Sequence, residues 1–267
     1  MSYQFLEVTI EDHVATLTLA RTESMNALSL SFTAEIATAF RELGANDEVR
    51  AIVLASKAKA FCAGLDLKEF AAIGMKGTAK SSLEFPEKLR ALFESCDGIE
   101  ACPKPVIAAV NGMCIGGGLD IIAACDIRLC TQDATFSLRE AAIGLVADMG
   151  VLQRLPHVIG QGFTREMAFT ARFYKAEEAE KMGLVNAVYP DAPAMMDGAK
   201  RLARQIAANA PLAVQATKEV LNVSRQATVQ DGMSLAKHKN MVLMLSQDLK
   251  EAFVSFMEKR TPDFKGK

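Results

Sequence analysis

The sequence is poor in histidine and has no closely spaced cysteine pair. Its three histidines (His13, His157 and His238) are far apart, and none of its six cysteines belongs to a C-x-x-C motif. Zinc sites draw on clusters of these residues, so we expect no metal. Most of the cysteines stand in apolar runs, where a free thiol behaves as a small hydrophobe. We expect them to be reduced.

Long apolar runs and a strong net charge are also missing. No run reaches the roughly 18 residues that span a bilayer. The start, MSYQFLEVTIEDHV, lacks the basic and apolar regions of a signal peptide, and the ending, DFKGK, is not a peroxisomal tripeptide. The net charge of −2 gives no electrostatic reason to bind nucleic acid or an anionic membrane. We therefore expect a cytoplasmic protein with neither of these partners.

What the sequence does contain is a large apolar fraction arranged as alternating strands and helices. Half of the residues are hydrophobic and 23% are charged, which suits a sizeable core. Residues 4–20 predict two strands with a turn at Glu11–Asp12. A helix should start at a Ser29 or Ser31 cap, run to about Leu43 and end at Gly44. The remaining expected strands of the first 140 residues are 50–56, 105–110, 126–131 and 134–139, with helices at about 81–99 and 116–125.

After Asp148 the pattern becomes helical. Helices are expected at about 149–158, 162–171, 176–182, 192–208, 210–224, 229–246 and 248–258, with one strand at 184–189. The composition changes near residue 195, so we predict an α/β core over residues 1–194 and a helical region over 195–267. The last helices carry many apolar residues, which either pack on the chain's own core or form a subunit interface.

Two glycine-containing loops precede expected helices. The first is Phe61-Cys62-Ala63-Gly64-Leu65-Asp66, and the second is the segment Gly112–Asp120 with its Gly116-Gly117-Gly118 turn. The second loop has neither the G-x-G-x-x-G spacing nor a Walker lysine, which argues against nucleotide binding. Helix N-termini present unpaired N–H groups. Two such loops, each donating one N–H, would form an oxyanion hole for a thioester enolate.

Three acids, Asp120, Glu140 and Asp148, stand in the apolar stretch 102–150. An ionised acid in a dry site is costly unless it is paired, so these residues need an explanation. Structural explanations exist for each: Asp120 could favour a helix N-terminus, Glu140 could be a surface acid paired with Arg139, and Asp148 could cap the next helix. Together with the glycine loops, the three acids favour proton transfer.

These residues resemble the crotonase, or enoyl-CoA hydratase/isomerase, family. The resemblance runs from RTESMNALS through KAFCAGLDL and PKPVIAAVNGMCIGGGLDIIAACDIR to LQRLPHVIG, LVNAVY and FMEKRTPDF. It implies an α/β fold with a spiral core of ββα turns and a C-terminal helical trimerisation region. It also implies an acyl-coenzyme A thioester substrate, no separate cofactor and a homotrimer or a hexamer built from two trimers. Its oxyanion donors match the N–H groups of Leu65 and Gly117, and its substrate-binding positions match Cys62, Ala63, Gly64, Leu65, Asp66 and Gly117.

The acids decide the expected reaction within that family. Hydratases of the family carry glutamates at the positions of Asp120 and Glu140, and usually a glycine at that of Asp148. The present acids and their spacing are similar to those of Δ3,5-Δ2,4-dienoyl-CoA isomerases. We therefore expect an enzyme in which Glu140 and Asp148 transfer protons while Asp120 orients or tunes them, without fixing which acid serves C2 and which C6.

Two other functions remain open on the sequence. The same fold could act as a 2-enoyl-CoA hydratase, with Asp120 and Glu140 working on a bound water. It could also be an RNA-binding or scaffold protein, a type known in this superfamily. The second alternative predicts broken acids or a lysine-rich helix, and the sequence shows neither.

Overall fold

The structure, a computed structural model, describes residues 3–74 and 79–267, without the side chains of 73, 74, 79–86 and 88. Among these residues, six strands form the main sheet in the order β1-β2-β3-β4-β6-β9, with β1 antiparallel to β2 and all other pairs parallel. Its strands are β1 (Leu6–Glu11), β2 (Val14–Leu19), β3 (Ala51–Ser56), β4 (Val106–Val110), β6 (Ile127–Thr131) and β9 (Ala187–Tyr189). A smaller sheet joins β5 (Met113–Ile115), β7 (Thr135–Ser137) and β8 (Tyr174–Lys175).

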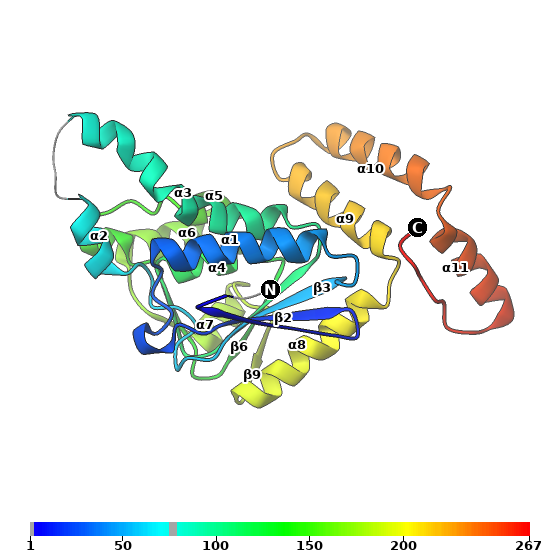
Figure 1. The fold of residues 1–267 in the computed structure, drawn as a ribbon, viewed down its shortest axis with the longest axis horizontal. Helices are drawn as coiled ribbons and strands as arrows, with labels where there is room; N and C mark the ends of the chain where they lie inside the picture. The colour runs from blue at the N-terminus through cyan, green and yellow to red at the C-terminus, as the bar shows by residue number, and fades with distance from the viewer. Residues whose placement is uncertain (1–2, 75–78) are drawn as a thin grey trace.

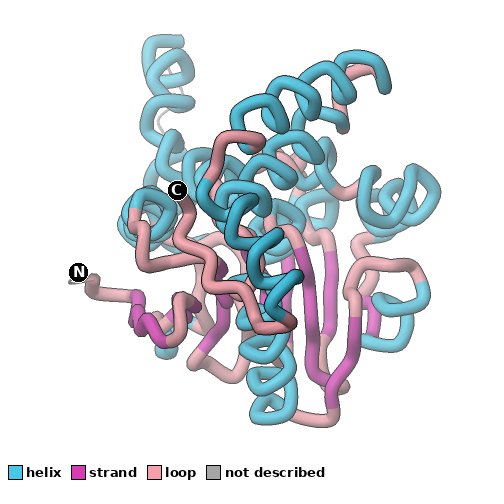
Figure 2. The backbone as a smooth tube through the Cα atoms, turned by 90° about the vertical axis from the view of Figure 1, so that its right-hand side faces the viewer, coloured by secondary structure: helices cyan, strands magenta, loops and turns pink. Residues whose placement is uncertain are grey.

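Helices surround the main sheet and continue beyond it (Figure 1). They are α1 (Leu30–Ala45), α2 (Leu67–Gly74), α3 (Ala79–Ala101), α4 (Gly117–Ala124), α5 (Val151–Arg154), α6 (Pro156–Thr170), α7 (Ala176–Lys181), α8 (Ala192–Ala207), α9 (Pro211–Ser224), α10 (Val229–Leu243) and α11 (Gln247–Glu258). Two 3-10 turns, η1 (Thr22–Ser24) and η2 (Glu140–Ile143), complete the elements. Figure 2 shows the strands side by side, with helical layers on either side of them.

Successive side chains of a strand point to opposite sides of the sheet, so its central strands contribute to an apolar cluster on each face. In β3, Ile52 and Leu54 join the larger apolar cluster with α1 and α3, whereas Ala51 and Val53 join a second cluster. That second cluster is closed by α8, which contributes small alanines such as Ala199 and Ala203. Since α8 already packs on the sheet, the helical extension that projects from the core in Figure 1 is α9–α11. The predicted boundary at residues 194/195 stays a prediction.

Most expected elements are present, with corrections at their ends. Ser29 is confirmed as the cap of α1, since its hydroxyl accepts a hydrogen bond from the Phe32 N–H at 3.2 Å. The prediction that Gly44 ends this helix was wrong, because α1 continues to Ala45. The first turn also lies one residue later than predicted, at Asp12–His13, where both residues adopt left-handed φ values of 50° and 63°.

Two short strands, β5 and β8, were not predicted from the sequence. β5 and β8 are three and two residues long and carry too little periodicity to be recognised. The break expected between residues 158 and 162 is present as a kink at Gly160, whose φ of 75° interrupts α6.

The helical extension is tied to the core by a buried ion pair. Lys218 of α9 lies 2.7 Å from a carboxylate oxygen of Asp126 and donates to the Lys104 carbonyl at 3.1 Å. The apolar residues farther along the chain do not pack on its own core. Those at least half exposed in α10, α11 and the turn between them are Val229, Met233, Met241, Val242, Met244, Leu245, Phe253, Phe256 and Met257. Of the two readings of this surface, the exposed side chains favour a subunit interface.

Candidate active site

The two glycine loops lie side by side although about fifty residues separate them in the sequence. The Cys62 N–H donates to the Met113 carbonyl, and the Ile115 N–H donates to the Cys62 carbonyl, both at 3.1 Å. A second short bridge joins the first loop to the segment before α1, where the Leu28 N–H donates to the Gly64 carbonyl at 2.7 Å. These backbone bonds place Leu65 next to the start of α4.

The N–H groups of Leu65 and Gly117 have no hydrogen-bond acceptor among residues 3–74 and 79–267. Gly117 is the first residue of α4, where an N–H has no partner within the helix. A side chain has no room here, because a Cβ on Gly117 would lie 2.7 Å from Cδ1 of Leu28. The two predicted oxyanion donors therefore lie in adjacent loops and are unpaired in the described part of the chain.

Glu140 lies against this pair of loops. It begins η2, is only 8% exposed, and its Oε2 is a buried oxygen without a partner in the described part of the chain. Its other oxygen, Oε1, is 3.1 Å from the position that a Cβ on Gly116 would take. Gly116 can allow this approach because it has no side chain and a φ of 52°. The alternative of a surface pair with Arg139 is wrong, since Glu140 is buried and Arg139 donates instead to the Ala171 carbonyl at 2.8 Å.

Asp120 is the most deeply buried of the three acids, at 1% exposure in the first turn of α4. Its Oδ1 accepts a hydrogen bond from the Val151 N–H at 2.8 Å. The pKa of this carboxyl is raised to about 7, mainly by burial and also by the charges of Glu140 and Asp148, against the opposite effects of the Val151 hydrogen bond and Arg154. At neutral pH Asp120 therefore exchanges readily between its two protonation states.

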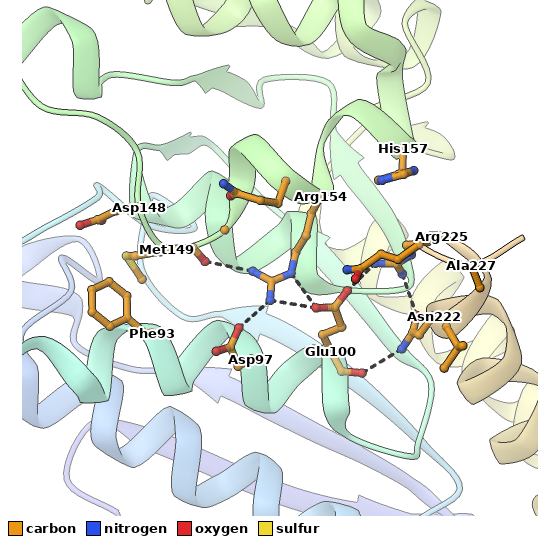
Figure 3. Close-up of a pocket in the computed structure, with 14 residues that line it drawn as sticks. Phe93, Asp97, Glu100, Asp148, Met149, Arg154, His157, Asn222, Arg225 and Ala227 are labelled. Atoms are coloured by element: carbon orange, nitrogen blue, oxygen red, sulfur yellow. Dashed lines mark hydrogen bonds and ion pairs between the residues drawn. The ribbon is translucent and has the colours of Figure 1, made fainter. Parts of the chain in front are cut away.

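Asp148 differs from the other two acids because its side chain is exposed. Partial burial raises its pKa. The alternative that it caps the next helix is wrong: the N-cap of α5 is Gly150, and no side chain bonds to this cap. Asp148 instead stands at the edge of a cavity of about 870 Å³ between α3, α5 and α9 (Figure 3).

The three acids influence one another as a cluster. The negative charge of Asp148 raises the pKa of Glu140, after the larger contribution of burial, and both acids raise the pKa of Asp120. Acids that raise one another's pKa release their protons over a wider range of pH than isolated acids do. A set of this kind can accept a proton at one point of a substrate and donate one at another.

The side chains of the first loop are held by structural contacts. The Cys62 thiol is fully buried and donates to the Asn26 carbonyl at 3.1 Å. Asp66 pairs with Arg21 at 2.8 Å, which lowers the pKa of this carboxyl. The contribution that this loop can make to a ligand therefore comes from its backbone, and the substrate-binding assignment of Cys62, Ala63, Gly64 and Asp66 stays a prediction.

Two residues that shape the site were not found from the sequence. The buried amide of Asn26 donates to the Phe61 carbonyl at 2.9 Å and so supports the first loop. Arg154 donates to the Met149 carbonyl at 3.0 Å and so supports the segment next to Asp148. In the sequence, each is only a polar residue close to apolar ones, and such a pattern does not predict which group it bonds to.

An isosteric change at Asp120 should make stability less dependent on pH. The folded protein keeps a proton on this carboxyl up to about pH 7, whereas an unperturbed Asp releases it near 3.9. Stability contributed by the neutral acid is therefore lost as pH rises through this window. We expect Asp120→Asn, whose amide oxygen can still accept the Val151 N–H, to raise Tm by several degrees more at pH 8 than at pH 5 (about 2–4 °C per kcal/mol).

The measurement is a set of thermal melts of the purified variants. Asp197→Asn, an exposed acid on α8, serves as the control and should show no such trend. An equal Tm change at both pH values for Asp120→Asn would contradict the assignment of a raised pKa.

Other ligand types have little support in the described residues. No group of three or more His, Cys, Asp or Glu side chains outside residues 1–2 and 75–78 is arranged to hold a metal ion. Within the same part of the chain, no helix combines the length and apolar character needed to cross a membrane.

Comparison with known proteins identifies relatives along the whole chain. A family model described as enoyl-CoA hydratase/isomerase matches residues 9–267. Curated relatives include the peroxisomal Δ(3,5)-Δ(2,4)-dienoyl-CoA isomerase of Arabidopsis thaliana, which is 39% identical over 98% of this chain and 98% of its own length. The mitochondrial enzyme of the same name from Homo sapiens is 42% identical over 93% of this chain and 77% of its own.

Solved structures agree with this. An enoyl-CoA hydratase from Bacillus anthracis matches with a TM-score of 0.91 and 31% identity, covering 99% of this chain and 100% of its own. The expected α/β crotonase-like fold with a C-terminal helical region is thus confirmed. On its sequence and its fold alike, the chain belongs to the enoyl-CoA hydratase/isomerase, or crotonase, family.

Proposed function

We propose that the chain is an isomerase that converts a 3,5-dienoyl-CoA into a 2,4-dienoyl-CoA. The observation that carries this proposal is the placing of two acids, Glu140 and Asp148, in one electrostatic cluster beside two unpaired oxyanion donors. A hydratase needs its acids to hold and activate one water. An isomerase of this type needs two acids spaced along the acyl chain, one near C2 and the other near C6. The printed names of the Arabidopsis thaliana and Homo sapiens relatives support the same reaction.

The oxyanion donors set the position of the substrate in this mechanism. The thioester oxygen accepts hydrogen bonds from the N–H groups of Leu65 and Gly117, which stabilise the negative charge that develops when C2 loses a proton. Glu140 packs against Gly116, the neighbour of Gly117, through Oε1, and its Oε2 is a buried oxygen with no partner in the described residues, so this carboxylate would lie beside a thioester held by Gly117. We therefore assign Glu140 to C2.

The remaining steps use the two acids, one of which accepts a proton while the other donates one. The Glu140 carboxylate accepts the C2 proton, and the electron pair of that bond spreads over C1 to C6 as a dienolate. Protonated Asp148 then donates its proton to C6, which leaves double bonds at C2 and C4. Burial raises the pKa of both acids, and the Asp148 charge raises that of Glu140 further, which favours one acid holding a proton while the other accepts one. Asp120, whose own pKa the two acids raise, is proposed to orient or tune this pair from behind.

A direct assay distinguishes the isomerase from the 2-enoyl-CoA hydratase. A 2,4-dienoyl thioester is conjugated with its carbonyl and a 3,5-dienoyl thioester is not, so isomerisation increases long-wavelength absorbance. Hydration of a 2-enoyl-CoA removes conjugation, so absorbance falls. We expect kcat/KM for the 3,5-dienoyl substrate to exceed that for the 2-enoyl substrate by at least about tenfold, a difference of about 1.4 kcal/mol. The reverse ratio would identify a hydratase.

The assembly is proposed to be a homotrimer or a dimer of trimers. The exposed apolar side chains of α10 and α11, such as Phe256 and Met257, are the surface that such an assembly would bury. Sedimentation velocity should show a mass of three or six chains, and Phe256→Asp should reduce it. A monomeric wild-type protein would contradict this. The cytoplasmic location stays a prediction.

A further inference from the structure

Arg154 stands at the centre of a charged network that includes Asp97 and Glu100 of α3 (Figure 3). Its guanidinium donates to Asp97 at 2.7 Å and to Glu100 at 2.9 Å, both on α3, and to the Met149 carbonyl at 3.0 Å. Its side chain is only 9% exposed. Burying an arginine costs desolvation free energy, and these partners fix the orientation of its guanidinium. A role other than stabilising the fold would explain its position.

The network controls the conformation of one short segment. Gly150 has a φ of 105°, and a Cβ on it would lie 1.9 Å from Nη1 of Arg154, so the guanidinium fills the space that a side chain would need. The peptide that Arg154 holds by the Met149 carbonyl directly follows Asp148. One residue after Gly150, the Val151 N–H donates to Asp120 Oδ1. In Figure 3 the Asp148 side chain points away from the guanidinium, so Arg154 acts on this acid through the backbone.

The network is also anchored from the helical extension. Glu100 forms an ion pair with Arg225, at the end of α9, and the Glu100 carbonyl accepts from the Asn222 amide at 3.1 Å. Asn222 in turn accepts a hydrogen bond from Arg225 at 2.8 Å. The orientation of Arg154 therefore depends on both α3 and α9. The backbone that Arg154 holds, at Met149, is next to Asp148.

We infer that Arg154 is a positioning residue of this active site, which holds the Met149–Gly150 peptide so that Asp148 faces the reacting chain and Val151 keeps its hydrogen bond to Asp120. This inference rests on the proposed isomerase function for its kinetic consequences. Its geometric content, the fixing of the 148–151 segment, is independent of that function. Arg154 contacts no proposed substrate atom, so its removal should change the rate of the reaction more than the binding of the thioester.

The kinetic test compares Arg154→Met and Arg154→Lys with Arg172→Lys, a matched arginine that also bridges two carboxylates but is 43% exposed on the surface. We expect Arg154→Met to lower kcat about 100-fold, the scale associated with displacing a reacting group by about 1 Å, with KM close to the wild-type value. Arg154→Lys should recover part of this loss, because it restores the charge without the fork of donors. Arg172→Lys should behave as wild type.

A substrate-free measurement separates this inference from the proposed function. Carbon-13 NMR titration of the carboxyl groups should show the pKa of Asp120 rising in Arg154→Met and unchanged in Arg172→Lys, because the Arg154 charge lowers it in the wild type. The charged or titratable groups that face Asp120 are Glu140, Asp148, Arg154, Cys62, Cys96 and Cys114. Of these, only Arg154 changes in the variant. A wild-type enzyme inactive on 3,5-dienoyl-CoA would refute the proposed function while leaving this titration interpretable.

A less disruptive substitution in the same network controls for misfolding of Arg154→Met. Asp97 is 68% exposed and removal of its charge leaves no buried group unpaired, so Asp97→Asn should fold. It should lower kcat less than Arg154→Met does, and combining the two changes should give no further loss, because both act on one network. Wild-type kcat in Asp97→Asn and Arg154→Met would overturn the inference. So would a rise in KM as large as the fall in kcat with unshifted carboxyl titrations, which is the pattern of a loosened fold.

Discussion

Replacing Asp148 with asparagine is expected to reduce kcat for 3,5-dienoyl-CoA isomerisation by about 10³-fold, within the range of about 10² to 10⁴ that general acid–base groups contribute. An amide cannot donate a proton to C6 as a carboxylic acid does, so the dienolate returns to substrate. The side chain is exposed and caps no helix, so folding should be unaffected. KM should change little, because the oxyanion donors and the thioester site remain. Asp197→Asn is the matched control.

Exchange in heavy water shows which acid serves which carbon. With Asp148→Asn, Glu140 can still remove and return the C2 proton, so deuterium should enter C2 of the recovered substrate while isomerisation is blocked. With Glu140→Gln, both exchange and isomerisation should be lost. The opposite result, exchange in Glu140→Gln and none in Asp148→Asn, would reverse the assignment. Wild-type isomerisation in folded Asp148→Asn would exclude the two-acid mechanism.

Gly117→Ala is expected to lower kcat by about 10² to 10³-fold, the usual effect of losing one oxyanion donor. The new Cβ would lie 2.7 Å from Cδ1 of Leu28 and 3.4 Å from the Met149 sulfur, so the start of α4 must shift. A shift moves the Gly117 N–H away from the thioester oxygen. In contrast to Asp148→Asn, this change should also suppress deuterium exchange at C2, because the enolate itself is no longer stabilised.

The control for this change is Gly162→Ala in α6. A Cβ there meets nothing within 4 Å, and the backbone conformation is ordinary. Replacing a helical glycine by alanine at an unobstructed site is neutral or slightly stabilising. Full activity in Gly117→Ala, with the mutated residue resolved in an unchanged position, would remove Gly117 from the proposed oxyanion hole.

The chain's local structure was largely predictable because it depends on short-range patterns. Alternating apolar residues defined β1 and β2, and a capping serine, left open between Ser29 and Ser31, indicated the start of α1, where the structure has Ser29. The same reasoning failed for β5 and β8, since strands of two or three residues exist only where a partner strand lies beside them. It also misplaced the end of α1, where one glycine was not enough to stop a well-packed helix.

The sequence by itself determined that the chain has a crotonase-like pattern, two glycine loops and the three acids Asp120, Glu140 and Asp148. These features are local, so residue type and spacing reveal them. Only the tertiary structure decided how they meet. The backbone bonds between Cys62 and the segment 113–115 join the loops, Glu140 is buried while Asp148 is exposed, and Arg154 holds the Met149 carbonyl just after Asp148. The physical reason is that burial, charge coupling and hydrogen-bond partners arise from contacts between residues far apart in the chain, which no local pattern encodes.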